Sequence, residues 1–258
     1  MLQKRVITAT LGVAVVVLAL LLGTTTWQVL VFIAAVWAMI EFASLAHQRF
    51  YAVMSICAYL VIAYAVFSRS PVGTHFLVVV LAVFLAIPVL LQNRVSVQQS
   101  AFVLAGALYI GLGAKSLTEM HALPNGTLWL FVYLLSVWST DTAAYFVGRS
   151  VGGRKLLPAI SPNKTVSGSL GGLVAAIIIP TIVGVIAISP HGWVKYVVVG
   201  FAASVVGQIG DLIESAYKRT SGVKDSGHLL PGHGGMLDRT DSLLFAAPIV
   251  LWLMTSLR

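Results

Sequence analysis

Ionisable side chains gather in one short stretch of a chain that is otherwise strongly apolar. Residues 215–241 read SAYKRTSGVKDSGHLLPGHGGMLDRTD and hold four cations and three carboxylates, although charged residues make up only 9% of the 258 residues. Ionisable groups placed beside long apolar segments are costly and usually mark a functional site. This stretch is therefore the first place to look for chemistry.

Three aspartates in and near this stretch are candidate metal ligands. Asp238 and Asp241 are three residues apart and share one helix face, while Asp211 closes the preceding apolar segment. Clustered carboxylates repel one another unless they are protonated or neutralised by cations. Carboxylate oxygens are the ligands that Mg²⁺ prefers, so we expect these three residues to bind Mg²⁺, with a second cation left open. The alternative is that each aspartate forms an ion pair with a neighbouring lysine or arginine.

A glycine-rich run lies between these charged groups, at Pro231-Gly232-His233-Gly234-Gly235. Glycine lets the backbone adopt positive φ and approach a ligand closely, although such a run alone usually marks a turn. The run precedes the last apolar segment, and the free N–H groups that open a helix favour a phosphate anion. We therefore expect Gly234 and Gly235 to contact a phosphate, whereas His233 either donates to it or braces the loop.

The composition points to a membrane protein. Apolar residues make up 59% of the chain and the mean hydropathy is +0.96, whereas soluble domains are about 45–50% apolar. A helical span needs about 20 apolar residues, and lipid leaves no alternative to regular hydrogen-bonded backbone. We therefore predict an all-α polytopic transmembrane helix bundle. About nine spans are expected, at residues 6–22, 27–46, 51–67, 74–91, 100–118, 127–148, 168–188, 195–213 and 240–256.

The basic residues predict the orientation of these spans. With nine spans and a cytoplasmic N-terminus, cytoplasmic segments hold twelve of the 16 lysines and arginines. This bias follows the positive-inside rule, and it accounts for the net charge of +8 without a nucleic-acid partner. The two charged loops, 149–167 and 214–239, then lie on the cytoplasmic face. The site is accordingly expected at the cytoplasmic ends of the C-terminal helices.

Acidic residues divide the chain unevenly. Residues 1–126 contain only Glu41 and Glu119, whereas residues 127–258 contain the other six acids. No linker separates the two parts, so we expect one structural domain. Its catalytic region is 127–258, while 1–126 serves packing, a dimer contact or a lipid-facing wall. Glu41, deep in an apolar segment, is interpreted as a paired or neutral buried acid, with a direct role in the site as the alternative.

The motifs of the C-terminal half resemble those of a known enzyme family. Ser-x-x-Lys-Arg, then Lys-Asp, then Pro-Gly-His-Gly-Gly-x-x-Asp-Arg-x-Asp is similar to the defining motif of phosphatidate cytidylyltransferases, also called CDP-diacylglycerol synthases. Ser161-Pro162-Asn163-Lys164-Thr165 and the Asp141-x-x-Ala-Tyr stretch resemble two further stretches of that family. The Val166-Ser167 pair departs from the aromatic and polar residues common there. The N-terminal half resembles the family only in hydropathy.

The resemblance implies transfer of a cytidylyl group from CTP to phosphatidic acid, giving CDP-diacylglycerol and pyrophosphate. The lipid phosphate itself attacks the α-phosphorus, so the protein supplies position and charge rather than a nucleophile. It also implies an enzyme of the bacterial cytoplasmic (inner) membrane, with a homodimer left open. The implied roles are metal binding for Asp211, Asp238 and Asp241; contacts to CTP phosphates or pyrophosphate for Lys164, Lys224 and Arg239, with Lys224 also catalytic; headgroup contacts for Lys218 and Arg219; a phosphate or metal-bound water for Ser215; and nucleotide contact or support of the metal ligands for Asp141.

Two other functions are weighed against this one. A CTP-dependent polyprenol or phytol kinase would transfer the γ-phosphate to an alcohol and release CDP, but the complete motif from Lys218 to Asp241 favours the cytidylyltransferase. An ion-coupled transporter would place acids near the bilayer midplane in both halves, within inverted repeats. The acids here crowd one end of one half.

The expected orientation can be tested with topology reporters. A reporter inserted near Ser221 should lie in the cytoplasm, and one fused after Arg258 should lie on the opposite side of the membrane. The two positions flank a single predicted span, so reporters on the same side would show that the number of spans is wrong. A reporter at Ser221 that lies outside would overturn the positive-inside argument itself.

Overall fold

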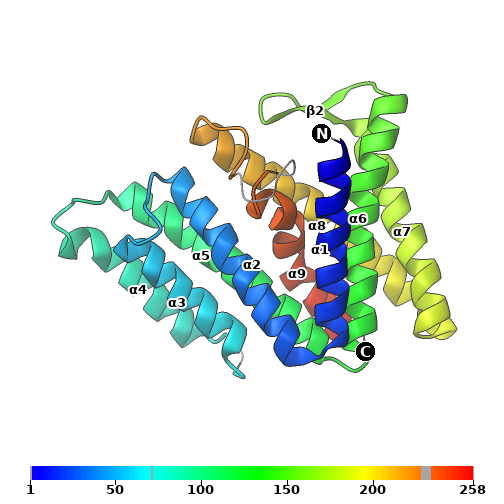
Figure 1. The fold of residues 1–258 in the computed structure, drawn as a ribbon, viewed down its shortest axis with the longest axis horizontal. Helices are drawn as coiled ribbons and strands as arrows, with labels where there is room; N and C mark the ends of the chain where they lie inside the picture. Colours follow the sequence, from blue (N-terminus) through cyan, green and yellow to red (C-terminus); the bar gives the residue numbers. More distant parts are fainter. Residues whose placement is uncertain (1, 71, 228–233, 258) are drawn as a thin grey trace. The chain divides into compact units, whose positions relative to one another are not determined.

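The computed structural model describes residues 2–70, 72–227 and 234–257, with the side chains of residues 2–6 and 190 left aside (Figure 1). Within these ranges it contains nine α-helices, one 3₁₀ helix and a two-stranded sheet. In chain order the elements are α1 (Leu2–Leu21), α2 (Thr24–Leu45), α3 (Val53–Phe67), α4 (Thr74–Leu90), α5 (Val97–Ala122), α6 (Gly126–Ser150), β1 (Lys155–Leu157), β2 (Ser161–Thr165), α7 (Val166–Ala187), η1 (Pro190–Gly192), α8 (Trp193–Thr220) and α9 (Leu237–Ser256).

The all-α prediction is confirmed, and each expected span coincides with one helix. In the described part of the chain, five helices are long and apolar enough to cross a membrane: α2, α5, α6, α7 and α8. The apolar helices α3 and α4 are shorter, at 15 and 17 residues. Helix α9 opens with charged residues before its apolar part. The number of nine crossings therefore stays a prediction.

Helix α8 is longer than the apolar pattern predicted. The expected span ended at 213, but the helix continues to Thr220, with Lys218 and Arg219 in its last turn. Cations are favourable at a helix C-terminus because they interact with the exposed carbonyls and the helix dipole. The extension places Asp211, Glu214, Ser215 and Lys218 at i, i+3, i+4 and i+7, which brings all four to one helix face.

The charged loop between α6 and α7 contains a hairpin that the sequence did not predict. Strands β1 and β2 pair antiparallel, with Lys155 opposite Thr165 and Leu157 opposite Ser161. Thr165 then caps α7, since its Oγ1 accepts the backbone N–H of Gly168 at 3.1 Å. Thr and Ser are favoured at this position because the side chain satisfies an N–H that the helix leaves free. The hairpin and cap fix Lys164 directly in front of α7.

The chain forms two compact units. One comprises residues up to Thr118 together with Ser221–Thr240, and the other comprises Glu119–Thr220 together with the chain from Asp241 onward. In the first unit, Trp27 of α2 donates to the carbonyl of Leu117 in α5 at 2.9 Å. In the same unit, Lys115 is buried and donates to the carbonyl of Ser68 at the end of α3. Long-range hydrogen bonds of this kind hold the helices of that unit in register.

In the second unit, α6 and α7 pack closely along their length (Figure 1). A Cβ on Gly168 would lie 2.7 Å from the carbonyl oxygen of Ala144, and one on Gly172 would lie 2.8 Å from that of Thr140. Glycine is therefore required by the distance between the two backbones. These small residues form the surface on which α7 packs against α6.

A second close approach, within the same unit, joins α8 to α9. A Cβ on Gly210 would lie 2.6 Å from Phe245 Cβ and 3.3 Å from the carbonyl oxygen of Asp241. One turn earlier, a Cβ on Gly207 would lie 3.5 Å from Ser242 Cβ. Because glycine has no side chain, α8 can approach the first turns of α9 closely at these two positions. The acidic face of α8 begins immediately after them.

Replacing Gly210 by alanine tests this contact. We expect Gly210→Ala to destabilise the protein by about 1–3 kcal/mol, because the new Cβ overlaps an atom fixed to the α9 backbone. Alanine alone would favour the helix by up to about 1 kcal/mol, so the sign separates the two effects. The measurement is the midpoint of thermal unfolding in detergent.

Gly12→Ala serves as the matched control. Gly12 also lies in a helix, but a Cβ there would meet nothing within 4 Å. Its unfolding midpoint should stay the same or rise. Equal midpoints for the two variants would contradict the proposed tight contact between α8 and α9.

Candidate active site

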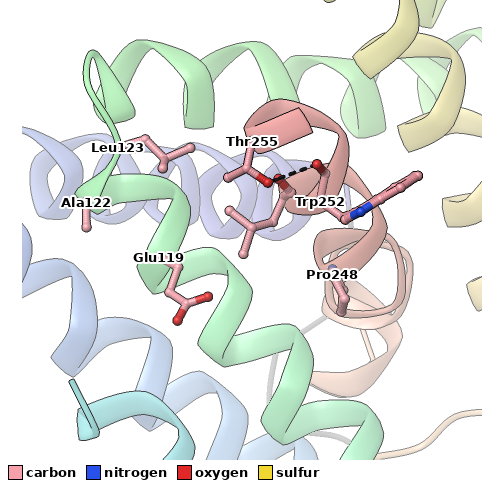
Figure 2. A pocket seen from close by; sticks show the side chains of 7 residues that line it. Glu119, Ala122, Leu123, Pro248, Trp252 and Thr255 are labelled. Atoms are coloured by element: carbon pink, nitrogen blue, oxygen red, sulfur yellow. Dashed lines mark hydrogen bonds between the residues drawn. The ribbon is translucent and has the colours of Figure 1, made fainter. Parts of the chain in front are cut away.

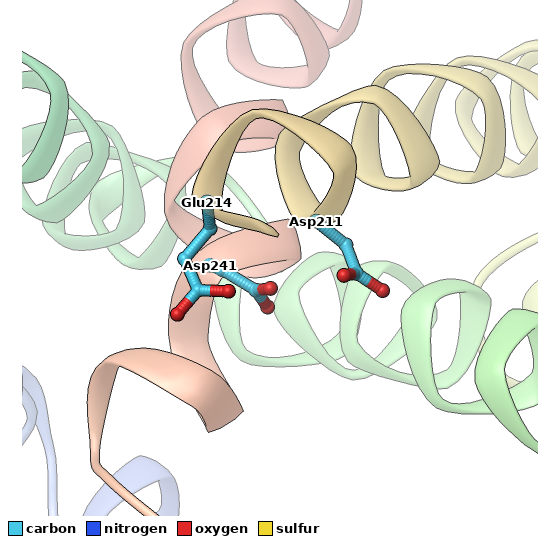
Figure 3. A group of neighbouring side chains, drawn as sticks. All are labelled: Asp211, Glu214 and Asp241. Atoms are coloured by element: carbon cyan, nitrogen blue, oxygen red, sulfur yellow. The ribbon is translucent and has the colours of Figure 1, made fainter. Parts of the chain in front are cut away.

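Three carboxylates of the second unit converge at the contact between α8 and α9. Asp211 and Glu214 come from α8 and Asp241 comes from α9, and each offers an oxygen within 4.8 Å of the others. Figure 3 shows the three side chains turned toward a common side of the two helices. Glu214 and Asp241 are buried, with 1% and 7% of their surface exposed, whereas the Asp211 side chain is 30% exposed. The cluster therefore opens outward at Asp211.

This grouping extends the sequence-based set by one residue. Asp211 and Asp241 come together as expected, and Glu214 is the third member of the group. Glu214 is absent from the predicted metal ligands because the eighth span was expected to end at 213. Had the helix been continued, the i, i+3 spacing from Asp211 would have identified it.

The cluster carries an excess of negative charge. Asp211, Glu214 and Asp141 all repel the charge of Asp241. Lys164 forms an ion pair with Asp211, and Lys218 Nζ lies 2.5 Å from Glu214 Oε2. Four ionised carboxylates and two lysines leave a formal charge of −2. Carboxylates this close and this buried require a further cation or a proton.

One of these two lysines, Lys164, is held in place by the hairpin. Lys164 stands in β2, immediately before the Thr165 cap, and its ammonium group meets the Asp211 carboxylate of α8. At the end of α8, Arg219 Nε donates to the carbonyl of Ile160 in the hairpin turn at 3.2 Å. Two side-chain contacts therefore hold the hairpin against α8. The Lys164 side chain is still 31% exposed, so it can also meet a ligand.

Ser215 is one turn beyond Asp211 on the same face of α8. Its Oγ donates to Asp211 Oδ1 at 3.4 Å, and the residue is buried. The hydroxyl orients the carboxylate that also meets Lys164. Asp141, a further predicted contact on this unit, is exposed on α6 and interacts electrostatically with Asp241.

Asp238 belongs to the first unit and is bound by backbone. Its Oδ2 accepts the N–H of Gly235 at 2.8 Å and that of Ser226 at 3.1 Å. Gly234, beside it, has φ of +83°, a conformation that side-chain-bearing residues rarely adopt. Asp238 is not a member of the three-carboxylate group, and the expected metal-binding role of this residue stays a prediction.

The other predicted phosphate-binding residues lie partly on the surface, partly in the interior and partly outside the described residues. Lys224 and Arg239 are exposed, and Gly235 is buried. His233 lies outside the described residues, as do Pro231 and Gly232. The predicted phosphate contacts of these residues therefore stay predictions.

A separate cavity of about 440 Å³ lies at the far end of α9 (Figure 2). None of the predicted site residues lines it, and its walls are mainly apolar. Its lining residues are Glu119, Ala122, Leu123, Pro248, Leu251, Trp252 and Thr255. The carboxylate cluster and this cavity are thus two distinct features of the second unit.

Comparison with known proteins gives the family. Residues 3–257 match the model of the cytidylyltransferase family. A phosphatidate cytidylyltransferase of Staphylococcus haemolyticus is 34% identical over 255 residues, which cover 96% of this chain and 97% of that protein. The phosphatidate cytidylyltransferase of Bacillus subtilis is 45% identical over 167 residues, but that match covers 64% of this chain and only 62% of the relative. With five long apolar helices and these bacterial relatives, the protein is an integral membrane protein, and it belongs to the cytidylyltransferase family.

Proposed function

We propose that the protein transfers the cytidylyl group of CTP to phosphatidic acid, giving CDP-diacylglycerol and pyrophosphate. The carboxylate cluster of Asp211, Glu214 and Asp241, with Lys164 held at its open side, is the observation that carries this proposal. Relatives named phosphatidate cytidylyltransferase support the choice of substrate. The reaction joins two polyanions, so it needs a site that combines metal ligands with cations.

The cluster suits a hard divalent cation. Its three side chains offer only oxygen, from α8 and α9, and they carry more negative charge than the two neighbouring lysines balance. Oxygen ligands of this kind favour Mg²⁺. Asp211, Glu214 and Asp241 would hold the ion, and its charge would stabilise the negative charge of the triphosphate.

The residues of the chain supply position and charge. An oxygen of the lipid phosphate forms the new bond to the α-phosphorus of CTP, the bond to the β-phosphate oxygen breaks, and pyrophosphate leaves with the electron pair. Lys164 is positioned to bind phosphate oxygens, because its ammonium group is fixed by the hairpin yet partly exposed. Ser215 keeps the Asp211 carboxylate oriented. Fixed charges of this kind stabilise a transition state without having to reorganise.

The membrane setting fits the substrates. Phosphatidic acid presents its phosphate at the bilayer surface, and Asp211, Ser215 and Lys218 lie in the polar last three turns of α8, beyond its apolar part. We place this surface on the cytoplasmic side of the bacterial inner membrane, where CTP is available and where the positive-inside bias puts the charged loops.

The reaction can be tested on purified protein in detergent with labelled CTP, phosphatidic acid and Mg²⁺. We expect a labelled lipid and free pyrophosphate. Excess EDTA should abolish turnover and added Mg²⁺ should restore it, because the carboxylates and the triphosphate need a shared countercharge. Full activity in EDTA would remove the metal from the proposal. Transfer of the γ-phosphate to a lipid alcohol, with release of CDP, would identify a lipid kinase instead.

The Asp241→Asn variant tests the cluster. We expect activity to fall by about 10²-fold or more, because an electrostatic group fixed in the site is lost. The unfolding midpoint in detergent should stay the same or rise, because removing one carboxylate relieves repulsion within the cluster. Asp211→Asn should behave in the same way. The double variant should lose much less activity than the product of the two effects, because both residues act on one ion.

Glu119→Gln provides the control, because Glu119 lines the separate cavity and should leave activity nearly unchanged. An Asp241→Asn variant with normal activity would overturn the assignment. So would one that loses activity only because it unfolds.

A further inference from the structure

Glu41 is a buried acid that the proposed chemistry does not use. It lies in α2, one of the long apolar helices, and only 6% of its surface is exposed. Its carboxylate accepts three hydrogen bonds: Ser226 Oγ at 3.1 Å, Met236 N at 3.0 Å and Leu237 N at 2.8 Å. A buried carboxylate is costly unless its oxygens are bonded in this way. The interpretation of Glu41 as a paired buried acid is therefore confirmed, and its partners belong to the motif stretch.

The bonds of Glu41 end at the start of α9. Leu237 opens this helix, and the first N–H groups of a helix have no acceptor within it. A carboxylate placed there satisfies two backbone donors and interacts favourably with the positive end of the helix dipole. Glu41, which lies almost 200 positions earlier in the chain, thus caps α9.

Asp238 is a second carboxylate that binds the same two short segments as Glu41. It accepts the N–H groups of Ser226 and Gly235, while Glu41 accepts the hydroxyl of Ser226 and the N–H groups of Met236 and Leu237. Ser226 is therefore bound to both carboxylates. The two flanks of the glycine-rich stretch, 226–227 and 234–237, are held together at one point.

The glycines around Glu41 fit this interpretation. A Cβ on Gly227 would lie 2.5 Å from Glu41 Oε1, and one on Gly235 would overlap both the Glu41 carboxylate and Ser226 Oγ. Neither residue has positive φ, so backbone conformation does not require glycine at these positions. The space that a side chain would need is occupied by the carboxylate.

We propose that Glu41 is a positioning residue of the active site. Its carboxylate sets where residues 234–237 enter α9, and with them the placement of Gly234, Gly235 and Asp238, which the sequence assigns to substrate and metal. Glu41 acts through this segment and does not itself contact the substrate. The role in the reaction rests on the proposed function, whereas the holding of the segment does not.

Hydrogen–deuterium exchange tests the holding directly. Glu41→Gln keeps the shape of the side chain, but the NH₂ group cannot accept an N–H, so part of the cap is lost. We expect the amides of Met236 and Leu237 to exchange at least about tenfold faster, with α6 to α8 unchanged. Ser44→Ala is the control, because its hydroxyl donates to the backbone carbonyl of Glu41 within α2 and not to the carboxylate. Unchanged exchange at Met236 and Leu237 in Glu41→Gln would overturn the proposal.

Kinetics test the consequence for the reaction. We expect Glu41→Gln to raise the half-saturating CTP concentration by about tenfold or more and to lower kcat. Glu41→Asp, which keeps both oxygens, should recover part of the loss. A purely structural role would reduce the amount of active protein and leave the half-saturating concentration unchanged, and that result would also overturn the proposal.

Ser226→Ala is a second, milder variant that keeps the proposal testable if Glu41→Gln does not fold. It removes one donor and keeps the carboxylate, so it should show the same two changes in weaker form if Glu41 positions the segment. Normal exchange and normal half-saturation in Ser226→Ala would count against the proposal where Glu41→Gln yields no folded protein. A wild-type protein that transfers no cytidylyl group would refute the proposed function, whereas the exchange result would still decide whether Glu41 holds the segment.

Discussion

The structure depends on how a strongly apolar chain satisfies its few buried carboxylates. A charge in a low-dielectric environment needs hydrogen bonds, a counterion or a metal. Glu41 receives two backbone amides and a hydroxyl, and Glu214 receives the ammonium group of Lys218. Asp241 accepts the N–H of the next residue, Ser242, and lies against two other acids. Glu41 thereby fixes a helix end and Glu214 fixes a cation, whereas Asp241 is left with an excess of negative charge around it.

Helix contacts and a capped hairpin bring the residues of the candidate active site together. The carboxylate cluster forms because α8 and α9 approach closely at Gly207 and Gly210, and because α8 continues helically past its apolar part. The hairpin adds Lys164 because Thr165 caps α7 and Arg219 binds the hairpin turn. A helix crossing and a capped hairpin together create a site that no single motif contains.

The sequence predicted the helices well because spans of about 20 apolar residues have few alternatives in lipid. It predicted Asp211, Asp241 and Lys164 as neighbours in function, and the structure brings them together. It missed the end of α8, because hydropathy stops where polar residues begin while the helix goes on. Glu214 was missed for the same reason. The hairpin and the partners of Glu41 depend on contacts between distant segments, which periodicity does not encode.

The short helices of the first unit bear on the membrane that suits the protein. At 1.5 Å per residue, α3 and α4, with 15 and 17 residues, are about 22 and 25 Å long. The hydrocarbon core of a typical bilayer is about 30 Å thick. Where these helices cross, hydrophobic mismatch must be relieved by local thinning or by flanking polar side chains that reach toward the headgroups. In a thinner bilayer of short-chain lipids, helices of this length would span the hydrocarbon core with less mismatch.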